Sequence, residues 1–145
     1  MDFEAIVKSG KFDMIDLQQV NQRFVQTLET LERVGIVDEN ILAYYACMKL
    51  LEFEIIDEQK AAVHNEAAAI IYGGFSFMNG AAALAFYHME KAIELDPENL
   101  EYKIVTLQAL ANAPGFEMDA GVRIAIANDI LKLEPQNVIG LRYCK

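Results

Sequence analysis

Two segments in the second half of the chain read almost alike, and this repetition restricts the fold more than any other feature. Residues 91–99 read KAIELDPEN and residues 128–137 read NDILKLEPQN, with Pro97 and Pro135 standing 38 positions apart. Each segment reads as a helix end followed by a turn. Proline cannot continue a helix, and repetition every roughly 20 to 50 residues is typical of stacked helical units. The pair therefore predicts a helical-repeat protein.

The composition agrees with long regular elements in one globular unit. Of the 145 residues, 54% are hydrophobic and 23% are charged, with only three prolines and eight glycines. A chain of this length fits one domain that buries roughly 70% of its unfolded surface. We therefore treat residues 1–145 as a single domain.

Apolar residues recur at three- and four-residue steps along most of the chain, which is the helical period. Asn79-Gly80 is a strong turn signal, and Pro97 is expected to start a helix. No stretch alternates with period two for long, so we expect no strand. The expected helices span residues 11–34, 39–58, 59–78, 81–95, 98–112, 120–133 and 136–145.

Residues 66–99 resemble the tetratricopeptide repeat, a helix–turn–helix unit of about 34 residues. The matches fall at the small-residue and turn positions: Gly73, Gly80, Ala85, Ala92, Leu95, Asp96, Pro97 and Asn99. Alanine and glycine at these spacings are expected to let paired helices approach closely. Larger positions depart from the family pattern, namely Ala69, Tyr72, Ser76 and Met89.

A second, degenerate repeat covers residues 100–137. It has 38 residues where the family has about 34, and the extra length falls in NAPGFEMD at residues 112–119. Ala127 and Ile130 stand where the family has an aromatic residue and an alanine. The resemblance implies an all-α fold: a right-handed stack of about three antiparallel helical hairpins plus a short C-terminal helix. A more closed helical bundle and a solenoid extended by dimerisation are the alternatives.

Signatures of chemistry are scarce. The sequence holds no GxGxxG, GxxxxGK[ST], GxSxG or HExxH string. His64 and His88 stand alone on predicted helices, Cys47 lies among apolar residues, and Gly73-Gly74 lies inside a helical pattern, where packing is the better explanation. We therefore predict no catalytic residue, no cofactor and no metal ligand, and a protein that is not an enzyme.

The chain is strongly acidic, with a formal net charge of −10. Such a surface repels phosphate backbones and speeds encounter with a basic protein. Residues 29–66 hold nine acids and three bases, a net charge of −6. This stretch either serves solubility or docks a basic partner, in which case the contacts are Glu52, Glu54, Asp57 and Glu58.

The resemblance also implies a binding face, because the first helix of each tetratricopeptide hairpin lines a concave groove. The groove positions would be Ala67, Ile70, Gly74 and Phe77, followed by Glu101, Ile104 and Gln108 in the next hairpin. An apolar groove with an acidic rim suits an amphipathic or basic segment. The other explanation is that the small apolar residues pack against the N-terminal helices.

These features predict a cytoplasmic, non-enzymatic adaptor that sequesters or neutralises one protein partner, expected to be basic, such as the immunity protein of a bacterial toxin. A secretion or assembly chaperone is the nearest alternative. A small-molecule or peptide sensor would need a pocket near Tyr44, Tyr45, Tyr72, Phe75 and Phe77. Nucleic acid and membrane are not expected partners, since the longest apolar run, residues 67–78, is shorter than the roughly 20 residues that span a bilayer. Homodimer formation stays open.

Overall fold

The computed structural model describes residues 44, 47–48, 50–52, 55–74, 76 and 79–145. Among these residues there is no strand, which confirms the all-α prediction. The helices are α4 (Asp57–Gly74), α5 (Ala81–Leu95), α6 (Leu100–Leu110), α7 (Ala120–Leu133) and α8 (Val138–Tyr143). Ahead of α4, Tyr44, Cys47, Met48 and Leu50 are helical too. The helix expected at residues 11–34 lies outside the described residues. Half of the one expected at 39–58 is described, and it ends earlier than expected, because Leu51 and Glu52 form a turn and Asp57 begins α4.

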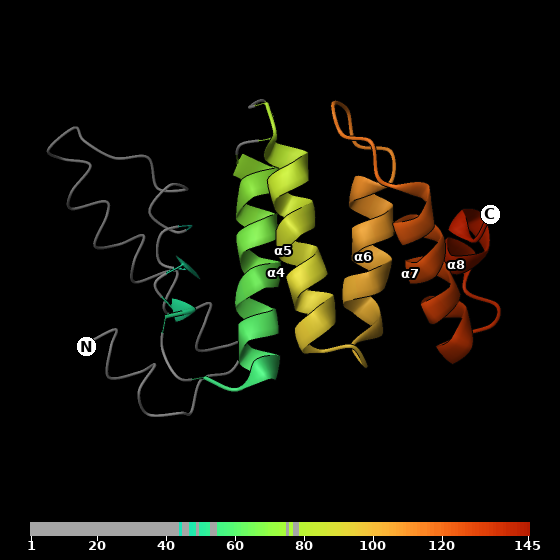
Figure 1. Ribbon diagram of the computed structural model, residues 1–145, viewed down its shortest axis with the longest axis horizontal. Helices are drawn as coiled ribbons and strands as arrows, with labels where there is room; N and C mark the ends of the chain where they lie inside the picture. Colours follow the sequence, from blue (N-terminus) through green and yellow to red (C-terminus); the bar gives the residue numbers. More distant parts are fainter. Residues whose placement is uncertain (1–43, 45–46, 49, 53–54, 75, 77–78) are drawn as a thin grey trace, which may run out of the picture.

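The helices lie side by side in chain order, and each runs opposite to the one before it from α4 to α7 (Figure 1). The most extensive contact joins α4 to α5. Contacts then continue from α5 to α6, from α6 to α7 and from α7 to α8, and α8 also touches α6. This part of the chain is thus a row of antiparallel neighbours.

The helix boundaries test the turn signals. The bounds of α5 and α7 are those expected, whereas α6 begins at Leu100 rather than at residue 98. Asn99 is its N-cap, and the Asn99 side chain accepts a hydrogen bond from the Tyr102 amide at 3.4 Å. The prediction that Pro97 starts the helix is therefore wrong, because Pro97 lies in the turn before the cap.

The repeated sequence forms the same turn twice. The Asn99 amide donates to the Asp96 carbonyl at 3.1 Å, and the Asn137 amide donates to the Glu134 carbonyl at 3.0 Å. Each asparagine side chain also donates to the carboxylate three residues earlier, at 3.3 Å and 2.8 Å. Each then caps the helix that follows. The likeness of the two segments in sequence is therefore also a likeness in structure.

The core between α4 and α5 is rich in alanine, which lets the two helix backbones approach closely. Ala85 and Ala92, placed at small-residue positions by the repeat pattern, are 1% and 0% exposed. Gly80 has φ of +86°, where glycine is favoured, so the expected turn is confirmed. Gly73 differs from expectation: it is exposed, and a Cβ there would meet no atom within 4 Å. Close helix packing therefore does not explain Gly73.

Candidate functional site

A groove of about 210 Å³ opens between α4 and α6 above α5. Its lining is mostly apolar, with an amide and a phenol as its polar side chains, and consists of Asn65, Ala68, Ala69, Tyr72, Gly73, Ala85, Met89, Val105, Ala109 and Leu110. We name these residues the α4–α6 groove.

The α4–α6 groove has a buried floor and accessible walls. Ala85, Met89 and Leu110 are at most 3% exposed and form the floor. Ala69 and Gly73, one turn apart on α4, are exposed, and Val105 on α6 is 37% exposed. Because alanine and glycine have the smallest side chains, Ala69 and Gly73 leave the groove unfilled. The groove therefore presents apolar surface that another molecule can cover.

The α4 positions expected to line a groove point elsewhere. Ala67 is fully buried in a second apolar cluster with Cys47 and Leu50, and Ile70 packs against the same cluster. Gly74 is half-buried, and Phe77 lies outside the described residues. The observed lining of α4 centres instead on Ala69 and Tyr72, which lie roughly opposite Ala67 around the helix at about 100° per residue. The segment before α4 thus covers the face expected to be free.

On α6, Glu101 and Gln108 are exposed and Ile104 packs partly into the core. Val105 and Ala109 line the observed groove, one residue on from the expected positions. Glu101 lies one turn before Val105 on the same stripe of the helix, so it places a carboxylate beside the apolar wall.

The predicted acidic docking patch is only partly described. Glu52, Asp57 and Glu58 are exposed, and Glu54 lies outside the described residues. Asp57 and Glu58 form the first turn of α4, where carboxylates interact favourably with the helix dipole. These two acids therefore also have a structural reason to be present.

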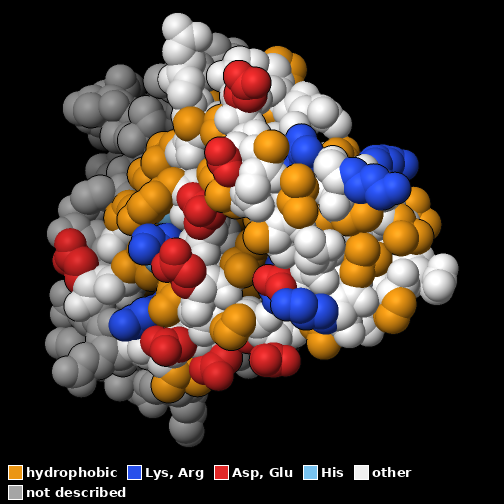
Figure 2. Space-filling view, turned by 45° about the vertical axis from the view of Figure 1, so that its right-hand side comes forward, with side chains coloured by type: hydrophobic (Ala, Val, Ile, Leu, Met, Phe, Trp, Pro, Cys, Tyr) orange, Lys and Arg blue, Asp and Glu red, His pale blue; other side chains and the backbone are white. Residues whose placement is uncertain are grey.

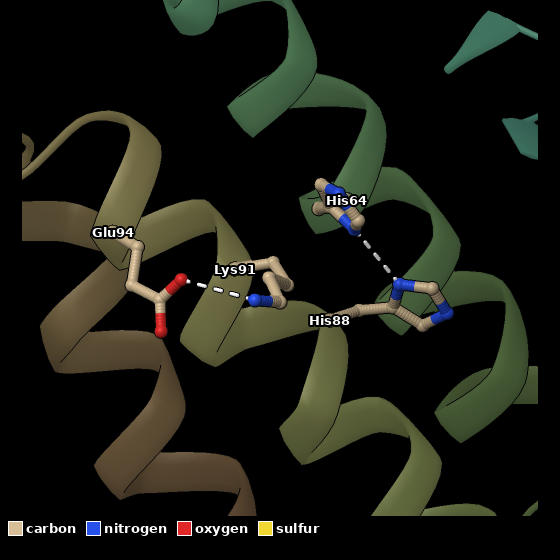
Figure 3. Close-up of polar contacts among 4 residues, drawn as sticks. All are labelled: His64, His88, Lys91 and Glu94. Atoms are coloured by element: carbon tan, nitrogen blue, oxygen red, sulfur yellow. Dashed lines mark hydrogen bonds and ion pairs between the residues drawn. The ribbon is translucent and has the colours of Figure 1, made fainter. Parts of the chain in front are cut away.

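A buried polar chain joins α4, α5 and the segment ahead of them. The Nδ1 atoms of His64 and His88 are 2.9 Å apart, and Tyr44 Oη lies 2.9 Å from His88 Nε2. His64 is 9% exposed and His88 is 1% exposed. Figure 3 shows the two imidazoles facing one another between α4 and α5. Their 24-residue separation matches no helical period or motif, so no sequence pattern predicts this contact.

Both imidazoles favour the neutral form. Burial, together with the neighbouring His64, lowers the pKa of His88 to about 4. Burial and then the Lys91 ammonium lower the pKa of His64, while Glu94 opposes them. Lys91 is itself bonded to Glu94 at 3.2 Å on α5 (Figure 3). Two neutral rings can share one proton between their Nδ1 atoms, so the pair links the two helices.

Two other kinds of reactive group that a protein can offer are a cysteine thiol and a cluster of metal ligands. Burial, reinforced by the Glu66 carboxylate, raises the pKa of the Cys47 thiol to about 12, so no thiolate forms there near neutral pH. Across the described residues, no three side chains of the histidine, cysteine, aspartate and glutamate types are grouped as a metal site would need.

No protein family, no curated protein and no solved structure matches this chain. Along the described residues, the structure holds no helix that is both long enough and apolar enough to cross a bilayer.

Proposed function

We propose that this chain is a non-enzymatic, helical-repeat protein that binds one protein partner by taking an apolar side chain of that partner into the α4–α6 groove. The observation that carries the proposal is the groove itself, with its buried floor at Ala85, Met89 and Leu110 and its exposed walls at Ala69, Gly73 and Val105.

The size of the groove favours a side chain over a metabolite. Pockets for small ligands usually measure about 300 to 1,000 Å³. The α4–α6 groove measures about 210 Å³ and is open along one side. An apolar cavity of about 150 Å³ accommodates a benzene-sized group. One aromatic or branched aliphatic side chain on a partner helix therefore fits the groove better than a metabolite does.

The charge of the chain indicates the chemistry around that anchor. The net charge is −10, and Glu101 lies beside the Val105 wall. A partner segment with one large apolar residue flanked by lysine or arginine would match both features. The proposed partner is therefore basic.

A tetratricopeptide-like stack is the arrangement that we propose for the whole chain. The alternating helix directions support it (Figure 1). So do the two equivalent turns around Asn99 and Asn137. In such a stack, a groove between successive first helices is where partners bind. A right-handed superhelical path is part of the same proposal.

Within this class, neutralising a basic protein in the cytoplasm, as the immunity protein of a bacterial toxin does, is the role that we propose first. An acidic inhibitor would meet a basic toxin quickly. A secretion or assembly chaperone would use the same groove. Whether a recovered partner is toxic without this chain, or merely aggregates without it, separates the two roles.

Affinity purification from host cells tests the proposal with a matched pair of variants. Ala69→Trp fills the groove, whereas Ala83→Trp adds the same side chain at an exposed position of α5 that does not line it. We expect one basic protein to be captured by the wild type and by Ala83→Trp, and lost from Ala69→Trp. Equal capture by both variants, with both folded by circular dichroism, would contradict the proposal.

The acidic patch is tested separately. Replacing Glu52 and Glu58 by glutamine and Asp57 by asparagine removes charge without placing a cation at the start of α4. If the patch steers the partner, association slows and its dependence on salt flattens, while dissociation stays the same. An unchanged association rate would mean that these acids serve solubility alone.

A further inference from the structure

The charge of the chain is divided unevenly along its length. Residues 120–145 hold four bases and two acids, a net charge of +2. Since the whole chain has −10, residues 1–119 carry −12. Figure 2 shows one face on which acidic side chains gather over the middle and left and several basic side chains lie on the right, while two basic groups lie among the acidic ones and hydrophobic side chains are spread across the face.

Helix α8, at this positive end, leaves an apolar face without a partner. Val138 and Leu141 are one turn apart and are 66% and 51% exposed. The opposite side holds the helix in place, because Gly140 is buried against Leu131 and the Tyr143 hydroxyl accepts a hydrogen bond from Asn112 at 3.0 Å. These contacts fix the orientation of α8, so its apolar face is held toward the outside.

The exposed face of α8 matches the α6 wall of the α4–α6 groove. On α8, Val138, Leu141 and Arg142 share one face at steps of three and four residues. On α6, Glu101 and Val105 share one stripe in the same way, and Val105 lines the groove. The apolar face of α8 carries the Arg142 cation, and the apolar α4–α6 groove has the Glu101 anion beside it. The two surfaces of the same molecule are therefore complementary.

A single molecule cannot join the two surfaces. Helix α8 is packed on α7 and α6 at the far end of the row (Figure 1). The groove lies between α4 and α6. Contact between them therefore needs two copies in a head-to-tail arrangement. Such an interface leaves one free surface on each copy, so it adds one copy after another until a ring closes or an open chain grows.

We propose that α8 of a second copy occupies the α4–α6 groove, with Leu141 in the groove and Arg142 beside Glu101. This inference rests on the groove named in the proposed function and adds its occupant when no other partner is present. A basic partner then competes with α8 for the groove. Self-association and partner binding are thus mutually exclusive.

Sedimentation velocity on the purified full chain, over a range of concentrations at low salt, tests the inference with two variants. Leu141→Glu places a negative charge in the apolar face of α8, and Ala69→Trp fills the groove. We expect the wild type to form species that grow with concentration and each variant alone to associate at least about tenfold more weakly. Mixed one to one, the variants should form a dimer and nothing larger, because one intact α8 meets one intact groove.

The charge pair has its own control. Arg142→Glu and Glu101→Arg should each weaken association several-fold, and the double variant should restore it. Circular dichroism and the Ala83→Trp variant check that folding is intact. A wild type that stays monomeric, a mixture that stays monomeric, or association that survives Ala69→Trp would each overturn the inference.

Comparing self-association with capture of the basic partner shows which of the two proposals fails. The Leu141→Glu chain keeps an intact groove, so it should still capture the basic partner. Capture by Leu141→Glu without wild-type self-association would overturn only the head-to-tail contact. Self-association of the expected kind without any partner capture would instead contradict the proposed function.

Discussion

Asn99 and Asn137, 38 positions apart, make the same set of contacts: each donates to the carboxylate three residues before it and caps the helix that follows. Replacing either by alanine removes a cap, which costs about 1 kcal/mol of unfolding free energy. Asn99→Ala should lower the thermal midpoint of the whole domain, because α6 packs against α5 and α7.

Asn137→Ala acts on a shorter helix, since α8 has six residues. We expect its main effect to be faster amide hydrogen exchange in α8, with a smaller change in thermal midpoint than Asn99→Ala gives. Identical exchange rates in α8 before and after the change would show that the second turn does not hold the helix.

Two glycines should respond to alanine in opposite ways. At Gly140, a Cβ would lie 2.8 Å from Leu131 Cδ2 and 3.2 Å from Ile130 Cγ2. Since Ile130 is fully buried, Gly140→Ala should cost about 1 to 3 kcal/mol of stability. At Gly73, a Cβ meets no atom within 4 Å, so Gly73→Ala should be neutral or stabilise α4 by up to about 1 kcal/mol. Urea denaturation of both variants checks the contrast, and a stabilised Gly140→Ala would contradict the packing of α8.

The buried histidines predict a loss of stability in acid. The unfolded chain binds a proton at His88 near the ordinary pKa of 6.5, whereas the folded chain binds it only near a pKa of about 4. Unfolding therefore takes up a proton in this window. Stability is fully present above about pH 6.5 and falls toward pH 4, by up to about 3 kcal/mol for His88.

His88→Gln isolates this effect from the carboxylates, because glutamine does not titrate and can still bond to Tyr44 and His64. The difference in unfolding free energy between wild type and variant should shrink or change sign as the pH falls from 7 to 4. Parallel stability curves over that range would show that the histidine pair does not contribute to the acid response.

The sequence predicted helices well and helix faces poorly. The bounds of α5 and α7 were predictable because Asn79-Gly80, the loop segment at residues 112–119 and the two proline turns mark their ends. The start of α6 was missed because proline fits both a first helical position and a turn, and only the Asn99 cap decides between them.

The groove lies on a different face of α4 from the predicted one, for a related reason. Ala67, Ala68 and Ala69 are alike in sequence, so nothing local says which one faces a neighbour. The segment ahead of α4 decides this by covering Ala67 with Cys47 and Leu50, and it leaves Ala69 exposed. The His64–His88 contact is likewise set by how α4 and α5 pack, and no spacing rule predicts it.

The most direct test of the central claim is site-specific photo-crosslinking in host cells. A photoreactive benzophenone side chain in place of Tyr72 extends an aromatic ring that already lines the groove and leaves Ala69 and Gly73 unfilled, and the same group at Ala83 serves as the control outside it. We predict a crosslink from position 72 to one basic partner protein, in yield that falls when salt is raised, and none from position 83. Crosslinks of equal yield from both positions, or a partner captured only from position 83, would contradict binding in the α4–α6 groove.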